Sequence, residues 1–138
     1  VLLAGYNGTL KDRAIAIVGT GRLVGAPLAH LWLGGGLNVT TYDDTTVDLQ
    51  SELRQADVIV TATGVPGLIT SSMVSAGKVV VDAGTASEGG VIVGDVAADL
   101  RERQDITITP EKGGVGPLTI TALFDNVITA ATKRSKHL

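Results

Sequence analysis

The sequence contains no cysteine, and aromatic residues make up only 3% of its 138 positions. The absence of cysteine excludes a disulfide framework, thiolate-bound zinc and a cysteine nucleophile. The two histidines, His30 and His137, are too few and too far apart along the chain to form a histidine metal site. With so few aromatic residues, the core has to be built from Val, Ile, Leu and Ala, which suit buried parallel strands beneath helices. The composition therefore favours an α/β fold over an aromatic-rich sandwich.

The chain also lacks a strong charge of either sign and any long apolar run. Eleven basic and fourteen acidic side chains give a formal charge of -3, and the one basic cluster, "KRSKHL" at the end, is typical of a solvated tail. The longest apolar runs, such as "KVVVDAG" (78–84), fall far short of the roughly 20 residues that span a bilayer. We therefore expect no nucleic-acid or membrane partner, and a cytoplasmic location.

Short apolar runs recur along the chain, and each ends near Gly, Thr or Asp. They are typical of buried parallel strands, and they lie at 14–18, 38–42, 57–62, 78–83 and 105–109. The segments between them predict helical connections, so the expected fold is a Rossmann-like, doubly wound parallel sheet with helices on both faces. No linker or repeat divides the chain, and we expect one domain over residues 1–138.

Three of the expected connections have apolar residues at helical spacing. The first is assigned one face made of Leu23, Pro27, Leu28, Leu31 and Trp32. Short helical segments are expected within 46–56 and 71–77. A long closing helix, packed on the sheet, is expected from Pro117 onward through Ile120, Leu123, Phe124, Val127 and Ile128.

The run "VGTGRLVG" (18–25) places Gly19, Gly21 and Gly25 directly after a predicted strand and at the start of a predicted helix. A dinucleotide site needs this context: a tight turn, close backbone approach to a pyrophosphate, and the N–H groups of a helix N-terminus. Glycines also end strands for steric reasons alone, but their place between a strand and a helix favours cofactor binding.

Asp43 and Asp44 end the second predicted strand. Asp43 lies 22 positions beyond Gly21, close to the roughly 20-residue offset at which an acid binds the adenine ribose. Either carboxylate would accept hydrogen bonds from the ribose hydroxyls and repel a 2′-phosphate, which favours NAD over NADP. The alternative is that the two aspartates only end the strand or cap the next helix.

Further glycine loops follow the later strands, at the sheet edge where open α/β folds bind ligands. Gly64, Val65 and Pro66 are candidates for the adenosine or ribose side of a dinucleotide, and Gly84 and Thr85 for the nicotinamide side. Plain turns without a ligand remain the alternative at both loops. The dense glycine loop within 109–119 predicts close passage to a ligand or partner.

Five stretches, taken in order and spacing, resemble the cofactor domain of the bifunctional methylenetetrahydrofolate dehydrogenase/methenyltetrahydrofolate cyclohydrolases. The resemblance runs from about Leu2 to Ala131, and its most specific part is the last glycine loop with the "GPLT" that follows it. The stretches are "IVGTGRLVGAP", "ADVIVTATGVPGLIT", "GKVVVDAGT", "VGDV" and "ITPEKGGVGPLTITAL".

The resemblance implies a two-domain enzyme that oxidises 5,10-methylenetetrahydrofolate by hydride transfer to NAD(P) and hydrolyses the methenyl product to 10-formyltetrahydrofolate. It also implies a homodimer joined through the cofactor domain. The family's catalytic Tyr-x-x-x-Lys lies in an N-terminal domain, and "YNGTL" does not supply it, because Leu10 stands four positions after Tyr6. We therefore expect a fragment of a longer chain that binds the cofactor but is inactive alone.

Departures from the family pattern bear on the choice of cofactor. Thr20 and Gly21 stand where many members carry Arg and Ser, and the resemblance implies that those residues hold the 2′-phosphate in NADP-using relatives. Asp43 and Asp44 stand where a His-Ser pair is usual, so NAD is favoured over NADP. Glu111 and Lys112 replace Val-Pro and bring charge to the folate end of the cleft.

No catalytic residue or metal ligand is assigned within the chain, and the candidates all serve the nicotinamide dinucleotide. Two other functions stay open: a free-standing, non-catalytic nucleotide-binding or dimerisation module, and a related dehydrogenase acting on an amino or hydroxy acid. The cofactor-binding candidates are Gly19, Thr20, Gly21, Arg22, Leu23, Val24, Gly25, Pro27, Asp43, Asp44, Thr63, Gly64, Val65, Pro66, Gly84, Thr85, Gly114 and Thr119.

Overall fold

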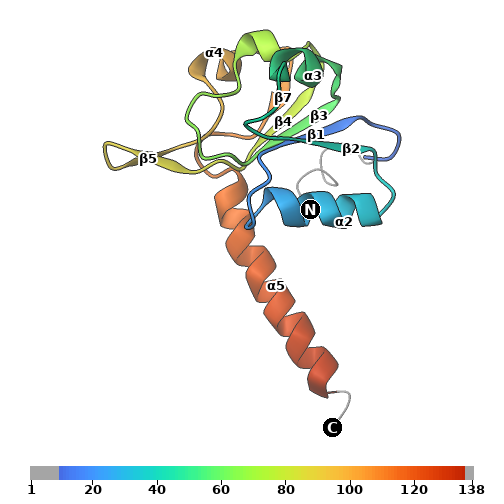
Figure 1. The fold of residues 1–138 in the computed structure, drawn as a ribbon. Helices are drawn as coiled ribbons and strands as arrows, with labels where there is room; N and C mark the ends of the chain where they lie inside the picture. The colour runs from blue at the N-terminus through green and yellow to red at the C-terminus, as the bar shows by residue number, and fades with distance from the viewer. Residues whose placement is uncertain (1–9, 136–138) are drawn as a thin grey trace.

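A five-stranded sheet forms the centre of the molecule in the computed structural model, which describes residues 10–135 (Figure 1). Tyr6 and the rest of the opening segment lie outside the described residues. The strands lie in the order β2-β1-β3-β4-β7, and all neighbours are parallel. This confirms the predicted doubly wound parallel sheet. The strands are β1 (Ile15–Val18), β2 (Val39–Tyr42), β3 (Val58–Thr61), β4 (Val79–Asp82) and β7 (Thr107–Ile108).

The strand order reverses at β1, which pairs with β2 on one side and with β3 on the other. Ile15 is in register with Val39 of β2 and with Val58 of β3. The chain therefore leaves the sheet in opposite directions after β1 and after β2. Ligands of open α/β sheets bind at the carboxyl ends of the strands at such a reversal, so the topology points to the crevice between the ends of β1 and β3.

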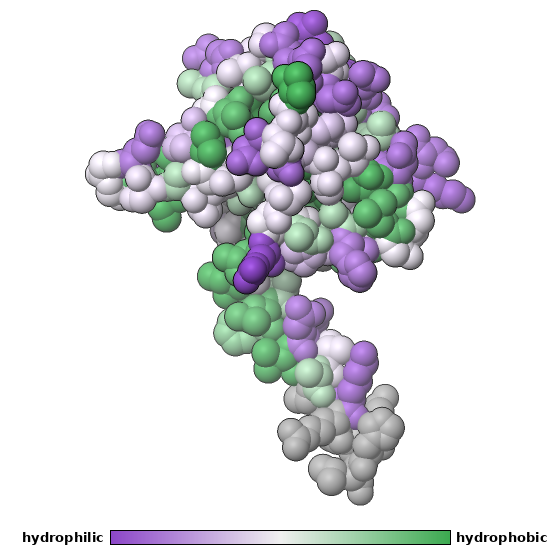
Figure 2. All heavy atoms as spheres, in the orientation of Figure 1, coloured by the Kyte–Doolittle hydropathy of each residue, from purple (hydrophilic) through white to green (hydrophobic). Residues whose placement is uncertain are grey.

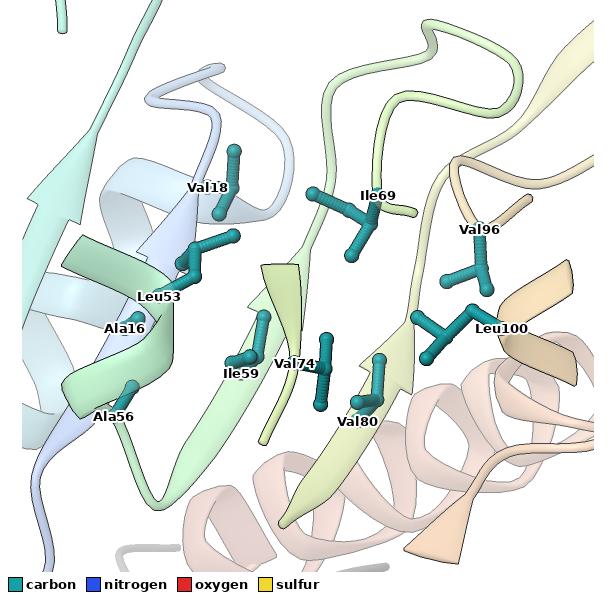
Figure 3. Packing of buried hydrophobic residues seen from close by; sticks show 10 residues of the cluster. All are labelled: Ala16, Val18, Leu53, Ala56, Ile59, Ile69, Val74, Val80, Val96 and Leu100. Atoms are coloured by element: carbon teal, nitrogen blue, oxygen red, sulfur yellow. The ribbon is translucent and has the colours of Figure 1, made fainter. Parts of the chain in front are cut away.

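Both faces of the sheet are buried at its central strands β1, β3 and β4, as expected for a parallel sheet with helices on either side. Alternate residues of β1 contribute to opposite layers, Ala16 and Val18 to one and Ile15 and Ile17 to the other. Figure 3 shows the first layer. Its buried members are Ala16, Val18, Leu53, Ala56, Ile59, Ile69, Val74, Val80, Val96 and Leu100, and those of the second are Ile15, Ile17, Ala29, Val58, Val60 and Val81.

Short connections cover the first layer. The helices α3 (Leu49–Gln55) and α4 (Ala98–Arg101) bury Leu53 and Leu100 there. Asp48 caps α3, because its side chain accepts a hydrogen bond from the backbone N–H of Ser51. The segment expected to be helical within 71–77 is a single 3-10 turn, η1 (Ser71–Met73).

The helix α2 (Gly25–Gly34) covers the second layer through Leu28, Ala29 and Trp32. The face predicted for this helix is partly wrong. Leu23 precedes the helix and is 95% exposed, and Leu31 is 68% exposed. Pro27 is exposed as well: Pro27 and Leu31 each lie two positions from the buried Ala29, about 200° around the helix, and therefore face outward.

The long helix α5 (Val115–Ser135) exists, but the prediction that it packs on the sheet is wrong: it extends away from the body (Figure 1). Its apolar spacing identified a helix and not the surface that the helix contacts. Since α2 already covers one face of the sheet and α3 and α4 the other, α5 leaves the body beyond its first turn. Apolar surface therefore lies open along it (Figure 2). The exposed residues are Ile120, Leu123, Phe124, Val127 and Ile128, each between 57% and 65% exposed.

An antiparallel hairpin that the sequence reasoning missed projects from the body between β4 and α4 (Figure 1). It consists of β5 (Ala86–Glu88) and β6 (Val91–Val93). Gly89 and Gly90 form its two-residue turn with φ of +55° and +82°, the conformation that a Gly-Gly pair adopts readily. The Gly-Gly pair between the two short strand segments is the sequence signal that could have predicted the hairpin.

Candidate functional site

The crevice between the carboxyl ends of β1 and β3 contains a cavity of about 520 Å³. It brings together three segments that are distant in the sequence: the first glycine loop, the two aspartates after β2 and the loop after β3. Among the predicted residues, its lining includes Gly19, Thr20, Gly21, Asp43, Asp44, Thr63 and Val65.

Gly19 and Gly25 are required by the shape of the first loop. Gly19 has φ of +98°, and a Cβ there would lie 2.6 Å from the carbonyl oxygen of Ala62. A Cβ at Gly25 would overlap the carbonyl oxygen of Gly19. Around Gly21, in contrast, a Cβ would meet nothing within 4 Å. Gly19 and Gly25 let backbone segments approach each other, whereas Gly21 faces open space.

The N-terminus of α2 lies directly after this loop. Among the described residues, no side chain caps it and its first turn carries no acidic residue. The backbone N–H of Ala26 donates to the carbonyl oxygen of Gly21, and that of Leu28 to Val24. Pro27 has no N–H, so the first turn offers a phosphate group the N–H of Gly25 together with the positive end of the helix dipole.

Asp43 is held in place by Thr45. Its Oδ1 accepts hydrogen bonds from the Thr45 hydroxyl (2.6 Å) and the Thr45 backbone N–H (3.0 Å). These bonds, the hydroxyl first, hold the pKa of the Asp43 carboxyl below its usual value. Among the described residues, nothing donates to its second oxygen. Asp43 therefore presents an ionised carboxylate to the cavity with one oxygen available for a ligand.

A second cavity, of about 260 Å³, lies on the other side of the loop after β3. Thr63 lines both cavities. The second one leads from the start of α2 to the loop after β4. The candidates in its lining are Gly21, Arg22, Leu23, Val24, Thr63, Gly64, Gly84 and Thr85.

The last glycine loop and the start of α5 border a third cavity, of about 500 Å³. Gly84, Thr85, Gly114 and Thr119 line it together with Glu111, the acidic departure from the family pattern. The Thr119 hydroxyl donates to the carbonyl oxygen of Val115 within α5 (3.2 Å).

Three of the predicted cofactor-binding residues do not line any of these cavities. Gly25 lies beneath the first loop, Pro27 lies exposed on the first turns of α2, and Pro66 is exposed after Val65. None of them is in the lining of the three cavities. Of the three, Gly25 constrains the backbone course of the first loop, through its close approach to Gly19.

Two buried acids were not recognised as part of the site from the sequence. Asp82 ends β4 and pairs with Arg101. Asp95 is fully buried and accepts hydrogen bonds from the loop after β3. Their signal was their position: each is an acid next to an apolar strand, at the edge that carries the glycine loops.

Within residues 10–135, no group of three or more His, Asp or Glu side chains is arranged to hold a metal ion. The same part of the chain has no helix long and apolar enough to cross a bilayer.

Comparison with protein families gives a match over residues 1–135 to the family described as tetrahydrofolate dehydrogenase/cyclohydrolase, NAD(P)-binding domain. The chain is 39% identical to the bifunctional protein FolD of Aquifex aeolicus over 138 residues, covering 100% of this chain and 47% of that protein. It is 44% identical to FolD of Desulforamulus reducens over 120 residues, covering 87% and 42%. The chain thus spans about half the length of these relatives.

Solved structures give the same result. The FolD methylenetetrahydrofolate dehydrogenase/cyclohydrolase of Campylobacter jejuni superimposes with a TM-score of 0.87 at 39% identity, covering 96% of this chain and 48% of that one. The Trypanosoma brucei enzyme, complexed with NADP cofactor and inhibitor, gives 0.86 at 32%, covering 99% and 49%. A dipicolinate synthase polypeptide of Bacillus halodurans, at 18% identity and 0.62, covering 81% and 42%, shares the fold alone.

Proposed function

Because this chain belongs to the tetrahydrofolate dehydrogenase/cyclohydrolase family, as its NAD(P)-binding domain, we propose that it binds the dinucleotide in the crevice between β1 and β3 and prefers NAD. One observation carries the proposal. The 520 Å³ cavity places the first glycine loop and both aspartates around one space. Dinucleotide sites combine a phosphate-binding loop with a ribose-binding acid at the point where the strand order of the sheet reverses.

The residues that line the crevice fit a nicotinamide dinucleotide. The open space at Gly21 and the uncapped N-terminus of α2 suit the pyrophosphate. Asp43 would accept a hydrogen bond from the adenine ribose through its second oxygen. The 260 Å³ cavity, past Gly64 and Gly84, would take the nicotinamide half.

The preference for NAD rests on charge at the 2′ position. Asp43 is ionised, because its pKa is held below the usual value, and a 2′-phosphate would be repelled by it. Thr20 and Gly21 line the same cavity and carry no positive charge with which to pair that phosphate. An unpaired charge contact costs on the order of 1 to 3 kcal/mol, which is about fivefold to 150-fold in affinity.

For the complete protein, we propose the two activities of the family. A bound nicotinamide would accept a hydride from the methylene carbon of 5,10-methylenetetrahydrofolate, and hydrolysis of the methenyl product would give 10-formyltetrahydrofolate. This chain's part is to bind and orient the dinucleotide, and the remaining half would hold the folate and the reactive side chains. The third cavity, bordered by Glu111 and Gly114, is the side that would face the folate.

We also propose that the complete protein is a homodimer. The support is the exposed apolar surface outside the crevice: Val91 and Ile92 of the hairpin are 64% and 74% exposed, and α5 carries a row of exposed apolar residues. Sedimentation equilibrium of the complete protein tests this, and a monomer at micromolar concentration would contradict it.

Calorimetric titration of the complete protein with NAD and with NADP tests the proposed function. We expect both dinucleotides to bind, and NAD to bind at least tenfold more tightly. Binding of neither would overturn the assignment, and tighter binding of NADP would overturn the role of Asp43. Production of methenyltetrahydrofolate from methylenetetrahydrofolate and NAD tests the activity separately.

A further inference from the structure

Asp82 and Asp95 lie at the two ends of the β5–β6 hairpin and form a buried cluster beneath the dinucleotide loops. Asp82 is the last residue of β4, and Asp95 follows β6 by two positions. Asp95 is fully buried, and the side chain of Asp82 is 5% exposed. Two acids this deeply buried need partners, because an unpaired buried carboxylate is costly.

Asp95 obtains its partners from the end of β3 and the loop that follows. Its Oδ2 accepts from the Thr61 hydroxyl (2.6 Å) and the Thr63 backbone N–H (2.6 Å). Its Oδ1 accepts from the Gly64 backbone N–H (2.9 Å). Thr63 lines both cavities of the crevice, and Gly64 lines the smaller one.

Asp82 orients Asp95 and the loop after β4. Its Oδ1 accepts from the backbone N–H groups of Gly84 and Asp95, both at 3.0 Å. Its Oδ2 accepts from the Val96 backbone N–H (3.2 Å) and pairs with Arg101. The backbone on either side of the hairpin is therefore tied to one carboxylate.

Two glycines make room for this cluster, and each lies against the other segment's acid. A Cβ at Gly84 would overlap the carboxylate of Asp95, and a Cβ at Gly94 would overlap that of Asp82. The close approach is reciprocal, so the "DAG" and "GD" stretches are two halves of one arrangement. Neither glycine has a positive φ. Space for the opposing acid, and not backbone conformation, is what these positions require.

We propose that Asp95 is a positioning residue for the dinucleotide, an inference that rests on the proposed function. It fixes the loop at Thr63 and Gly64 in the conformation that forms the wall between the two cavities. It also occupies the two N–H groups that would otherwise be available to the ligand's phosphates. The pyrophosphate is thereby directed to the first glycine loop and the start of α2.

Asparagine at this position would break the arrangement while nearly keeping the shape. A carboxylate can accept at both oxygens, whereas an amide accepts at one and donates at the other. In Asp95→Asn the NH2 group would face either Thr63 or Gly64, and one N–H would lose its acceptor. Thr61→Val is the matched control, because it removes a buried hydroxyl bonded to Asp95 and leaves both loop N–H bonds.

The experiment compares the complete wild-type protein with these two variants by calorimetric titration with NAD and by amide hydrogen exchange. We expect Asp95→Asn to raise the Kd for NAD at least tenfold and to speed exchange at Thr63 and Gly64, with exchange in 15–25 unchanged. Thr61→Val should leave the Kd within twofold. An Asp95→Asn protein that binds NAD as the wild type does would overturn this inference and leave the proposed function standing.

A wild-type measurement decides the matter even where Asp95→Asn does not fold. The amides of Thr63 and Gly64 should exchange slowly both without and with NAD, because Asp95 already holds them. Protection that arises only on addition of NAD would show that these donors serve the ligand, and would overturn the inference. Failure of the wild type to bind either dinucleotide would overturn the proposed function and this inference together.

Discussion

Gly25, the first residue of α2, lies so close to Gly19 that a side chain at position 25 would overlap the Gly19 carbonyl oxygen. The start of the helix and the end of β1 are thus in direct backbone contact. This contact sets where the first helical N–H groups lie relative to the crevice.

Gly25→Ala should therefore lower both stability and dinucleotide affinity. The added methyl meets a backbone oxygen that cannot move aside without shifting the loop, and overpacking of this kind costs about 1 to 3 kcal/mol. Chemical denaturation and calorimetric titration measure the two effects. We expect the Kd for NAD to rise at least tenfold.

Gly21→Ala is the matched control for stability, because a Cβ there meets nothing within 4 Å. Its free energy of unfolding should stay within about 0.5 kcal/mol of the wild type. Equal destabilisation by the two substitutions would contradict the distinct roles given to these glycines.

Asp43→Asn should weaken NAD binding and narrow the preference over NADP. Removing the charge weakens the bond to the ribose and ends the repulsion of a 2′-phosphate. The Kd for NADP divided by the Kd for NAD should therefore fall about tenfold. Asp44→Asn serves as the comparison, since both acids line the cavity. A larger effect at Asp44 would move the ribose role to that residue.

The affinity for NAD should be insensitive to mild acid. Thr45 holds the pKa of Asp43 below its ordinary value of 3.8, so the carboxylate stays ionised throughout the range above that value. We expect the Kd for NAD to be constant from about pH 8 to pH 5. A rise of this Kd within that range would contradict an ionised Asp43 as the acceptor for the ribose.

The double substitution Thr20→Arg, Gly21→Ser should improve NADP binding. It adds a cation and a hydroxyl to the lining of the cavity, beside the proposed 2′ position. A side chain at position 21 has room, because a Cβ there meets nothing within 4 Å. A charge-assisted hydrogen bond is worth about 1.5 to 3 kcal/mol, so the Kd for NADP should fall about tenfold or more. Unchanged NADP affinity, with the fold intact, would show that these positions do not meet the 2′-phosphate.

Asp57→Asn tests a contact at the opposite edge of the sheet. Asp57 accepts hydrogen bonds from Lys78 (2.9 Å) and from the backbone N–H of Ala14 (3.0 Å), and so ties together the starts of β1, β3 and β4. These partners, Lys78 first, hold the pKa of Asp57 below its ordinary value of 3.8. With the Asp57 side chain 37% exposed, solvent screening limits the contribution of the ion pair to about 1 kcal/mol or less.

The sign of the pH dependence follows from the lowered pKa. The stabilisation is present above pH 3.8 and is lost as the pH falls through the value in the folded protein. The free energy of unfolding should therefore differ between wild type and Asp57→Asn by about 0.5 to 1 kcal/mol at pH 7, and by less at pH 3. A difference that grows toward pH 3 would contradict this.

The sheet and the loops around the crevice between β1 and β3 could be predicted because both depend on local pattern. Each strand is a short apolar run, and the loops that carry Gly19, Asp43 and Gly64 begin where those runs end. In a parallel sheet all such ends meet at one edge. Local signals therefore locate the loops without knowledge of any contact.

The position of α5 and the role of Asp95 could not be predicted in this way. Helical spacing shows which residues share a face, but not whether another helix already covers the sheet beneath it. Asp95 bonds to residues 31 to 34 positions away, and no local pattern identifies such partners. The hydrogen bond from the Asp95 backbone N–H to Asp82, across the β5–β6 hairpin, joins residues 13 positions apart and is equally invisible to local pattern.

The sequence by itself determined the positions of the strands along the chain and their parallel pairing, the glycine loop after β1 and the acidic residues after β2, since these follow from residue type and spacing. Only the tertiary structure decided that Gly25 contacts Gly19, that Asp95 holds the loop after β3, and that α5 leaves the body with its apolar side open. Those features depend on which distant segments compete for the same space, and packing resolves that competition only when the whole chain is folded.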